Sequence, residues 1–166
     1  MINILTLEDR KELLNKLEES CNLPTYSAGF LHIVNILHDD EDLSKDALRI
    51  ITSMKRYLFT DLVIVTLTQE NIQVAKYLQS IEIKRSAFAA GVYKYLQPDR
   101  PVNSYNRIKL LVENNFIIVN KYNSNLEMFV NSCCRREQID SLTYLIKKGY
   151  KFTNKNIDCL KQKIPS

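Results

Sequence analysis

Glycine and proline are scarce in this sequence, with three and four among 166 residues, and tryptophan is absent. A protein built from short strands needs turn-forming residues at regular intervals. The scarcity therefore disfavours a β-sandwich or barrel and favours helices joined by short loops. The glycines, Gly29, Gly91 and Gly149, are also isolated from one another, so the sequence contains no glycine-rich phosphate-binding loop.

Long apolar runs are missing as well. The longest, residues 62–67 and 116–119, fall far short of the roughly 20 residues that span a bilayer. Residues 1–10 become acidic at once and have no secretory apolar stretch. We therefore expect a cytoplasmic protein without a membrane partner.

The residues that usually carry catalysis or metal binding are few and scattered. Neither His32 nor His38 has a neighbouring motif that identifies a nucleophile, and the acidic run 38–42 lacks the spacing of a calcium-binding loop. The cysteines Cys133, Cys134 and Cys159 do not match structural zinc spacings, so we expect buried free thiols. The sequence thus predicts no catalytic residue, no metal and no cofactor, and indicates a protein that is not an enzyme.

Charge is divided unevenly along the chain. Residues 1–72 carry seven basic and twelve acidic side chains, a net charge of −5, and residues 73–166 carry sixteen and seven, a net charge of +9. Such asymmetry is typical of a chain with a basic binding face, although solvated helix faces can differ in this way without a function. Tyrosines are interleaved with the basic residues of the second half.

Three amphipathic helices are predicted between Met1 and Leu58. The first begins with a capping box at Thr6–Asp9, the second follows Pro24, and the third is capped by Ser44. Their buried faces follow the helical period. The predicted buried positions are Leu13, Leu14, Leu17, Phe30, Ile33, Val34, Leu37, Ala47, Ile50, Ile51, Met54 and Leu58.

Short helical segments continue to the C-terminus. They are predicted near residues 60–68, 71–80, 86–96, 104–115, 125–136, 138–148 and 154–163. Residues 62–67 are β-branched enough to form a strand, but helical neighbours on both sides favour a buried helix. Residues 116–119 are predicted to form a loop or a short extended link.

The second half contains a repeat. Residues 75–83, 108–116 and 142–150 align, and their matched leucines are Leu78, Leu111 and Leu145. The spacing between successive leucines gives a period of roughly 33 positions, which is typical of stacked helix pairs.

The last unit, residues 126–149, resembles an ankyrin repeat. Small residues at 132–134 occupy the part of the first helix where that family packs closely, and 136–138 would form the turn between the helices. The second helix would bury Ile139, Leu142, Leu145 and Ile146. Gly149 follows it, where a left-handed cap needs glycine.

The resemblance extends over residues 59–152 and implies an all-α fold of stacked helix-hairpin repeats. Residues 58–166 would form the ankyrin-like repeats and residues 1–57 an N-terminal helical cap, together one continuous domain. No unit has the family's Thr-Pro-Leu-His sequence, residues 98–101 lengthen the middle unit, and 114–115 contain no glycine. An irregular helical bundle is the alternative.

These features predict a protein-protein interaction module whose basic, tyrosine-bearing C-terminal half binds another protein, for which an acidic surface would be suitable. The alternatives are a nucleic-acid or nucleoprotein ligand, such as a small phage or viral inhibitor of a host machine, and head-to-tail self-association. Abundant lysine, asparagine and isoleucine fit a bacterial or viral origin. The predicted partner-binding residues are Tyr93, Tyr95, Arg100, Tyr105, Tyr122, Arg135 and Arg136.

Overall fold

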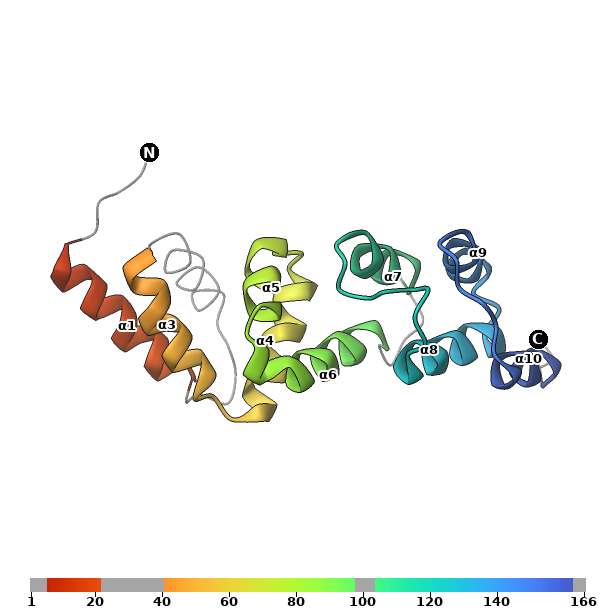
Figure 1. Cartoon of the computed structure of the whole chain (residues 1–166), viewed down its shortest axis with the longest axis horizontal. Helices are drawn as coiled ribbons and strands as arrows, with labels where there is room; N and C mark the ends of the chain where they lie inside the picture. The colour runs from red at the N-terminus through yellow and green to blue at the C-terminus, as the bar shows by residue number, and fades with distance from the viewer. Residues whose placement is uncertain (1–5, 22–40, 98–103, 163–166) are drawn as a thin grey trace. The chain divides into compact units, whose positions relative to one another are not determined.

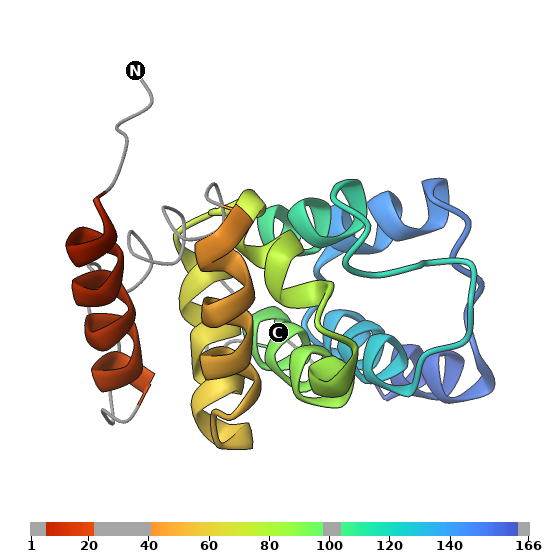
Figure 2. The same ribbon diagram turned by 60° about the vertical axis from the view of Figure 1, so that its left-hand side comes forward.

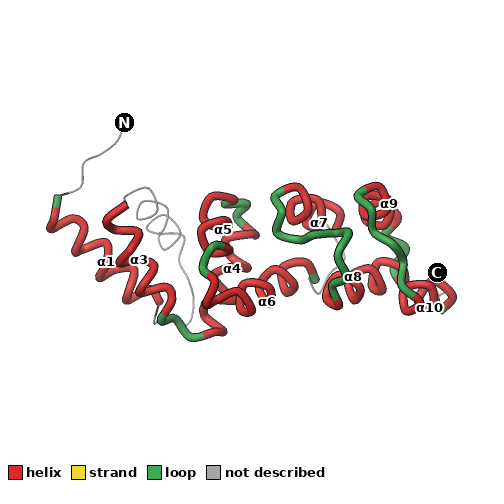
Figure 3. Tube along the Cα trace, viewed as in Figure 1, coloured by secondary structure: helices red, strands yellow, loops and turns green. Residues whose placement is uncertain are grey.

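The chain is all-helical wherever its structure is described. The computed structural model describes residues 6–21, 41–97 and 104–162, and these contain nine α-helices, a 3-10 turn and no strand (Figure 1, Figure 3). None of the helices in these ranges is both long enough and apolar enough to cross a membrane. The helix predicted after Pro24 and the candidate residue Arg100 lie outside the described residues.

The helices divide between two compact units, Met1–Gly91 and Val92–Ser166, and the division falls within one helix, α6. It does not coincide with the predicted boundary after residue 57, which lies inside α4. The helices are α1 (Leu7–Cys21), α3 (Glu41–Thr52), α4 (Arg56–Thr68), α5 (Ile72–Gln79), the 3-10 turn η1 (Glu82–Lys84), α6 (Arg85–Leu96), α7 (Ser104–Glu113), α8 (Ser124–Arg135), α9 (Ile139–Lys147) and α10 (Asn154–Lys161).

Helix α1 begins as the sequence predicted. The amide of Asp9 donates to Thr6 Oγ1 at 3.1 Å, and the amide of Thr6 donates to Asp9 Oδ2 at 3.2 Å, which confirms the capping box. These hydrogen bonds hold the pKa of the Asp9 carboxyl below its usual value. Helix α1 lies beside α3 (Figure 2).

The predicted third helix is two helices. Helix α3 begins at Glu41. Ser44 therefore lies within its first turn and is not its N-cap, the residue that precedes the first turn. It ends at Thr52, and Leu58 belongs to α4. The predicted face is nevertheless buried at all five positions, Ala47, Ile50, Ile51, Met54 and Leu58.

The β-branched segment 62–67 is a buried helix, as predicted. It forms the second half of α4, whose residues Phe59, Leu62, Val63 and Leu67 have no exposed surface. Helix α5 packs on α4, and its matched leucine Leu78 is fully buried. Burial of most of its surface explains the long apolar run in α4, whereas Tyr57, Asp61 and Thr68 lie on its exposed side.

In the C-terminal unit the helices form two rows. Helix α7 lies beside α9 in one row, and α8 lies beside α10 in the other (Figure 1). The matched leucines Leu111 and Leu145 are buried. Residues 116–119 connect the rows as a loop, which confirms that prediction.

The buried face of α9 was only half predicted. Leu142 and Leu145 are buried, but Ile139 and Ile146 are 62% and 51% exposed. The helix is rotated so that Ser141 faces α7, where its hydroxyl lies 3.0 Å from Ser104 Oγ. The two small side chains let α7 and α9 approach closely, and each hydroxyl gives the other a hydrogen-bond partner. A serine is therefore buried on α9 where the sequence predicted an isoleucine.

One backbone turn recurs inside the helix hairpins. Glu70, between α4 and α5, and Glu137, between α8 and α9, both have left-handed conformations with φ of 56° and 55°. In each turn the amide that follows the left-handed residue bonds back to the helix: Asn71 N to Thr66 O at 3.1 Å, and Gln138 N to Cys133 O at 3.0 Å. The predicted turn at 136–138 is therefore present, and a turn of the same conformation lies at Glu70.

A second recurring turn follows the second helix of a hairpin. Gly149 has φ of 100°, which confirms the predicted left-handed cap, and Asn115 takes the same conformation with φ of 61°. Tyr150 N bonds to Leu145 O and Phe116 N to Leu111 O, each at 2.9 Å. Asparagine tolerates positive φ better than most residues, so the missing glycine does not prevent the turn. After α5 the chain instead enters η1 and α6 directly.

We expect Gly149→Ala to destabilise the C-terminal unit by about 1 kcal/mol, because alanine resists positive φ. A Cβ at Gly149 would meet no atom within 4 Å, so the effect is one of backbone conformation alone. Conversely, Glu137→Gly relieves a strained residue and should be neutral or stabilising. Urea denaturation followed by circular dichroism measures both. Equal effects of the two substitutions would contradict this account.

Candidate partner-binding surface

Two of the predicted contact residues are largely structural. Tyr95 is only 6% exposed, its ring lies 5.0 Å from the guanidinium carbon of Arg107, and Arg107 Nη1 donates to its carbonyl at 2.7 Å. Tyr93 is half-buried, with its hydroxyl 3.5 Å from the sulfur of Met128. Tyr95 therefore belongs to the core of the C-terminal unit, whereas Tyr93 retains a partly accessible edge.

The other described candidates lie at opposite ends of α8. Tyr122 precedes the helix, whereas Arg135 is its last residue and Arg136 follows it. A helix of 12 residues separates the two groups by about 17 Å. The predicted set is thus divided between two places and does not form one surface.

Tyr105 is at the same end as the two arginines. With its neighbours 104 and 106 it lines a shallow hollow against the hairpin turn 137–140. Its ring packs edge-on against Tyr144, 5.8 Å between centroids, and the ammonium of Lys109 lies 5.9 Å from it. The charged residues that line the hollow, Glu137 and Asp140, are both acidic.

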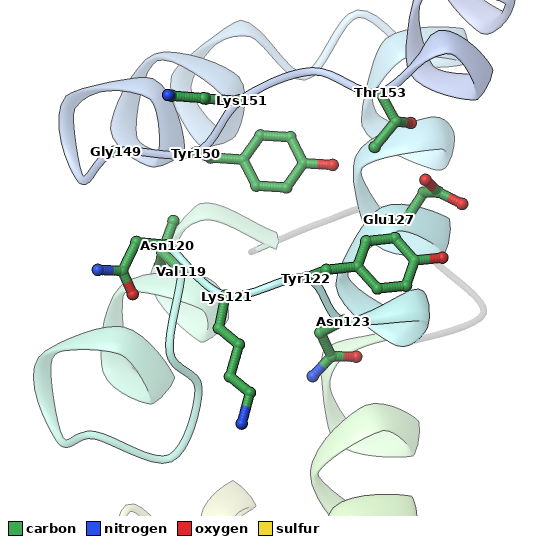
Figure 4. Close-up of a pocket in the computed structure, with 10 residues that line it drawn as sticks. All are labelled: Val119, Asn120, Lys121, Tyr122, Asn123, Glu127, Gly149, Tyr150, Lys151 and Thr153. Carbon is green, nitrogen blue, oxygen red and sulfur yellow. The ribbon is translucent and has the colours of Figure 1, made fainter.

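The other end of α8 has a better-formed cavity of about 320 Å³. Two loops line it: the one before α8 and the one before α10 (Figure 4). We call it the loop pocket. Its lining residues are Val119, Asn120, Lys121, Tyr122, Asn123, Glu127, Gly149, Tyr150, Lys151 and Thr153.

Both loops of the pocket end in a helix cap. Asn123 Oδ1 accepts the amides of Asn125 at 2.8 Å and Leu126 at 3.3 Å. Thr153 caps α10 in a reciprocal pair with Asn156: the amide of Asn156 donates to Thr153 Oγ1 at 3.2 Å, and the amide of Thr153 donates to Asn156 Oδ1 at 2.9 Å. These caps fix the backbone immediately after Tyr122 and after the 149–153 loop.

Asn156 also joins the pocket to α8. It is fully buried, and its Oδ1 accepts the hydroxyl of Tyr150 at 2.6 Å. Its Nδ2 donates to the carbonyl of Glu127 at 3.3 Å and to Asn131 Oδ1 at 2.5 Å. One side chain therefore connects α10, α8 and the loop that carries Tyr150.

Burial raises the pKa of Tyr150 to about 12, and the nearby Glu127 carboxylate adds to this effect. The phenol consequently remains protonated at physiological pH and keeps donating to Asn156. Its ring is further held by an edge contact with Phe152, 6.0 Å between centroids. Tyr150 thus presents a fixed, neutral aromatic face to the pocket.

Glu127 is the buried charge of the loop pocket. The residue is 7% exposed, although its carboxylate faces a cavity. The ammonium of Lys155 lies 4.0 Å away and belongs to a side chain that is 78% exposed. A pair of this length with an exposed lysine stabilises little. The negative charge of Glu127 is therefore only weakly compensated.

Sequence reasoning found Tyr122 but missed the rest of this site. Lys121, Lys151 and Tyr150 belong to the basic, tyrosine-rich half of the chain, yet nothing in the local sequence distinguishes them from their neighbours. Glu127 looks like any exposed residue in the first turn of a helix. Its burial results from α10 packing on α8, which no local pattern reports.

Among the side chains that the structure describes, Cys133, Cys134 and Cys159 are buried free thiols, as predicted. Burial raises the pKa of Cys133 to about 12 and also raises that of Cys134. Thiols in this state are poor nucleophiles. Within the part of the chain that the structure describes, no three histidine, cysteine or acidic side chains gather as metal ligands would.

Comparison with known proteins adds no relative. No protein-family model matches this sequence, and no curated protein or solved structure matches it.

Proposed function

We propose that the chain is a non-enzymatic protein-binding module built from ankyrin-like helix hairpins, and that it binds its partner through the loop pocket. Two kinds of support exist for the hairpin repeat: the matched buried leucines and the two recurring left-handed turns. Repeats of this type stack side by side and leave their connecting loops free for binding.

The observation that carries the proposal is the convergence of the loop before α8 and the loop before α10 on one cavity beside an exposed tyrosine. Tyr122 is 73% exposed, although its aromatic ring would be better shielded from water. Tyrosine is enriched at the centres of protein interfaces, where its ring fills a pocket and its hydroxyl finds a polar partner. Tyr122 is therefore the residue for which we expect the largest contribution to binding.

Three exposed lysines lie at or near the loop pocket: Lys121 and Lys151 line it, and Lys155 lies beside Glu127. They concentrate at one place the positive charge that dominates the second half of the chain. Such a rim steers acidic surfaces into contact and raises the association rate more than the final affinity. An acidic partner surface around the pocket fits this arrangement.

Quantitative affinity capture from cells of the source organism, after nuclease treatment, tests the proposal. We expect Tyr122→Ala to lose at least one protein that the unaltered chain retains, with binding weakened roughly tenfold or more, as at interface hot spots. Tyr57→Ala is the matched control, because Tyr57 is similarly exposed, at 61%, but belongs to the N-terminal unit.

Two results would oppose the proposal. In the first, Tyr122→Ala and Tyr57→Ala capture the same proteins as the unaltered chain. In the second, the captured material disappears with nuclease and its binding falls steeply with salt, which would indicate nucleic acid as the ligand.

A further inference from the structure

Two tyrosine rings and one carboxylate converge inside the loop pocket, whereas its lysines do not. In Figure 4 the rings of Tyr122 and Tyr150 and the carboxylate of Glu127 lie toward the same side of the cavity. The side chains of Lys121 and Lys151 extend away from that side. The interior of the pocket therefore differs in character from its basic rim.

This interior suits a cation. Aromatic faces carry partial negative charge and attract ammonium and guanidinium groups, most strongly when water is excluded. Tyr150 remains a neutral phenol, and Glu127 supplies a full negative charge that Lys155 compensates only across 4.0 Å. A second cation in the pocket would give that carboxylate a close partner, whereas an anion would have to approach it.

The size of the pocket and the charge of its rim restrict which cations it can accept. A cavity of about 320 Å³ is at the small end for ligand pockets and takes one long side chain. The rim lysines repel a segment that is basic throughout, so the cation must come from a segment that is otherwise neutral or acidic.

We infer that the loop pocket of Tyr122, Tyr150 and Glu127 receives one arginine or lysine side chain of a protein partner. The inference rests on the proposed function only for the source of the side chain. Arginine is the better ligand, because its planar guanidinium can stack on a tyrosine ring and bind a carboxylate through two hydrogens. The rim lysines then contact acidic residues on either side of it.

Titration of the full chain with N-acetyl-arginine amide, monitored by NMR of the tyrosine rings, tests the inference without any partner. N-acetyl-lysine amide is the second ligand, N-acetyl-citrulline amide the neutral isostere and N-acetyl-glutamate amide the anion. We expect the Tyr122 and Tyr150 rings to respond to the two cations, arginine more strongly, and not to citrulline or glutamate. Ring assignments come from the variants Tyr122→Leu and Tyr150→Phe.

Glu127→Gln should weaken arginine binding about tenfold, since it removes the charge but keeps the size of the side chain. Glu82→Gln, at an exposed glutamate of the N-terminal unit, is the matched control and should change nothing. If Glu127→Gln disturbs folding, Tyr122→Leu at the exposed ring should still weaken binding about threefold.

Two results would overturn the inference: no ring response to either cation, or a response to the glutamate ligand that survives Glu127→Gln and would reassign the pocket to anions. Neither result depends on capture of a partner. The titration can therefore reject a cation-binding pocket without rejecting the proposed protein-binding function. Affinity capture can likewise reject the protein-binding function without rejecting a cation-binding pocket.

Discussion

Replacing Asn156 with alanine is expected to destabilise the C-terminal unit by about 3–4 kcal/mol, because it strands several buried polar groups at once. The amide of Asn156 is fully buried and bonds Tyr150, Thr153, Asn131 and the carbonyl of Glu127. Each of these groups loses a hydrogen-bond partner at a position that is partly or fully shielded from water. Urea denaturation followed by circular dichroism measures the loss.

Asn154→Ala is the control for this substitution, because Asn154 is an exposed asparagine in the same helix. Its replacement should change the free energy of unfolding by no more than about 0.5 kcal/mol. Similar effects at the two positions would mean that Asn156 acts only through helix propensity. The network between α8 and α10 would then contribute nothing.

Gly91→Val is expected to destabilise the N-terminal unit by about 3 kcal/mol, at the upper end for an overpacked core. A Cβ at position 91 would lie 2.7 Å from Val63 Cβ, 2.8 Å from Val63 Cγ1 and 3.1 Å from the carbonyl of Thr60. Those atoms belong to α4, which is held to α6 where Thr60 Oγ1 bonds to Ala87 O at 3.4 Å. Relief therefore requires a shift of one helix against the other.

Ala89→Val, at an exposed position of the same helix, measures the effect of valine without the clash and should cost less than about 1 kcal/mol. A double-mutant cycle sharpens the test. Gly91→Ala should be destabilising in the unaltered chain and much less so in Val63→Gly, because that change removes both the Cβ and the Cγ1 that a Cβ at position 91 would meet. Additive effects would show that the two helices are not in close contact.

Much of the fold follows from local sequence. The capping box at Thr6, the helical state of 62–67, the hairpin turn at 136–138 and the cap at Gly149 each depend on residues within a few positions. Local hydrogen bonds and the helical period decide such features. These features could therefore be predicted without knowing which helices pack against one another.

Predictions failed where a choice between helix faces was required. The period of α9 permits a stripe through Ile139 and Ile146 or one through Ser141 and Leu145. The second is buried because Ser141 meets Ser104, 37 positions away. Hydrophobicity alone favours the isoleucines. Which face of α9 is buried depends on its contact with α7, and the sequence of α9 alone contains no information about that contact.

The candidate binding residues likewise include some that the sequence could identify and others that depend on tertiary packing. Tyr122 could be identified because it lies near a turn between helices, where side chains are commonly accessible. Tyr95 could not be rejected, since its burial depends on its packing within the C-terminal unit and on Arg107, 12 positions away. The acidic side chain of the loop pocket, Glu127, was missed for the opposite reason, because it is buried where its sequence context looks exposed.

The sequence by itself determined the helical class, the approximate helix positions and the free state of the thiols of Cys133, Cys134 and Cys159. These follow from composition, periodicity and contacts between near neighbours. The tertiary structure alone decided which end of α8 holds a cavity and which charge faces it. That outcome depends on Asn156 reaching Glu127 and Asn131 across 29 and 25 positions. Such pairings arise only when α10 packs on α8 and removes both helices' polar groups from water.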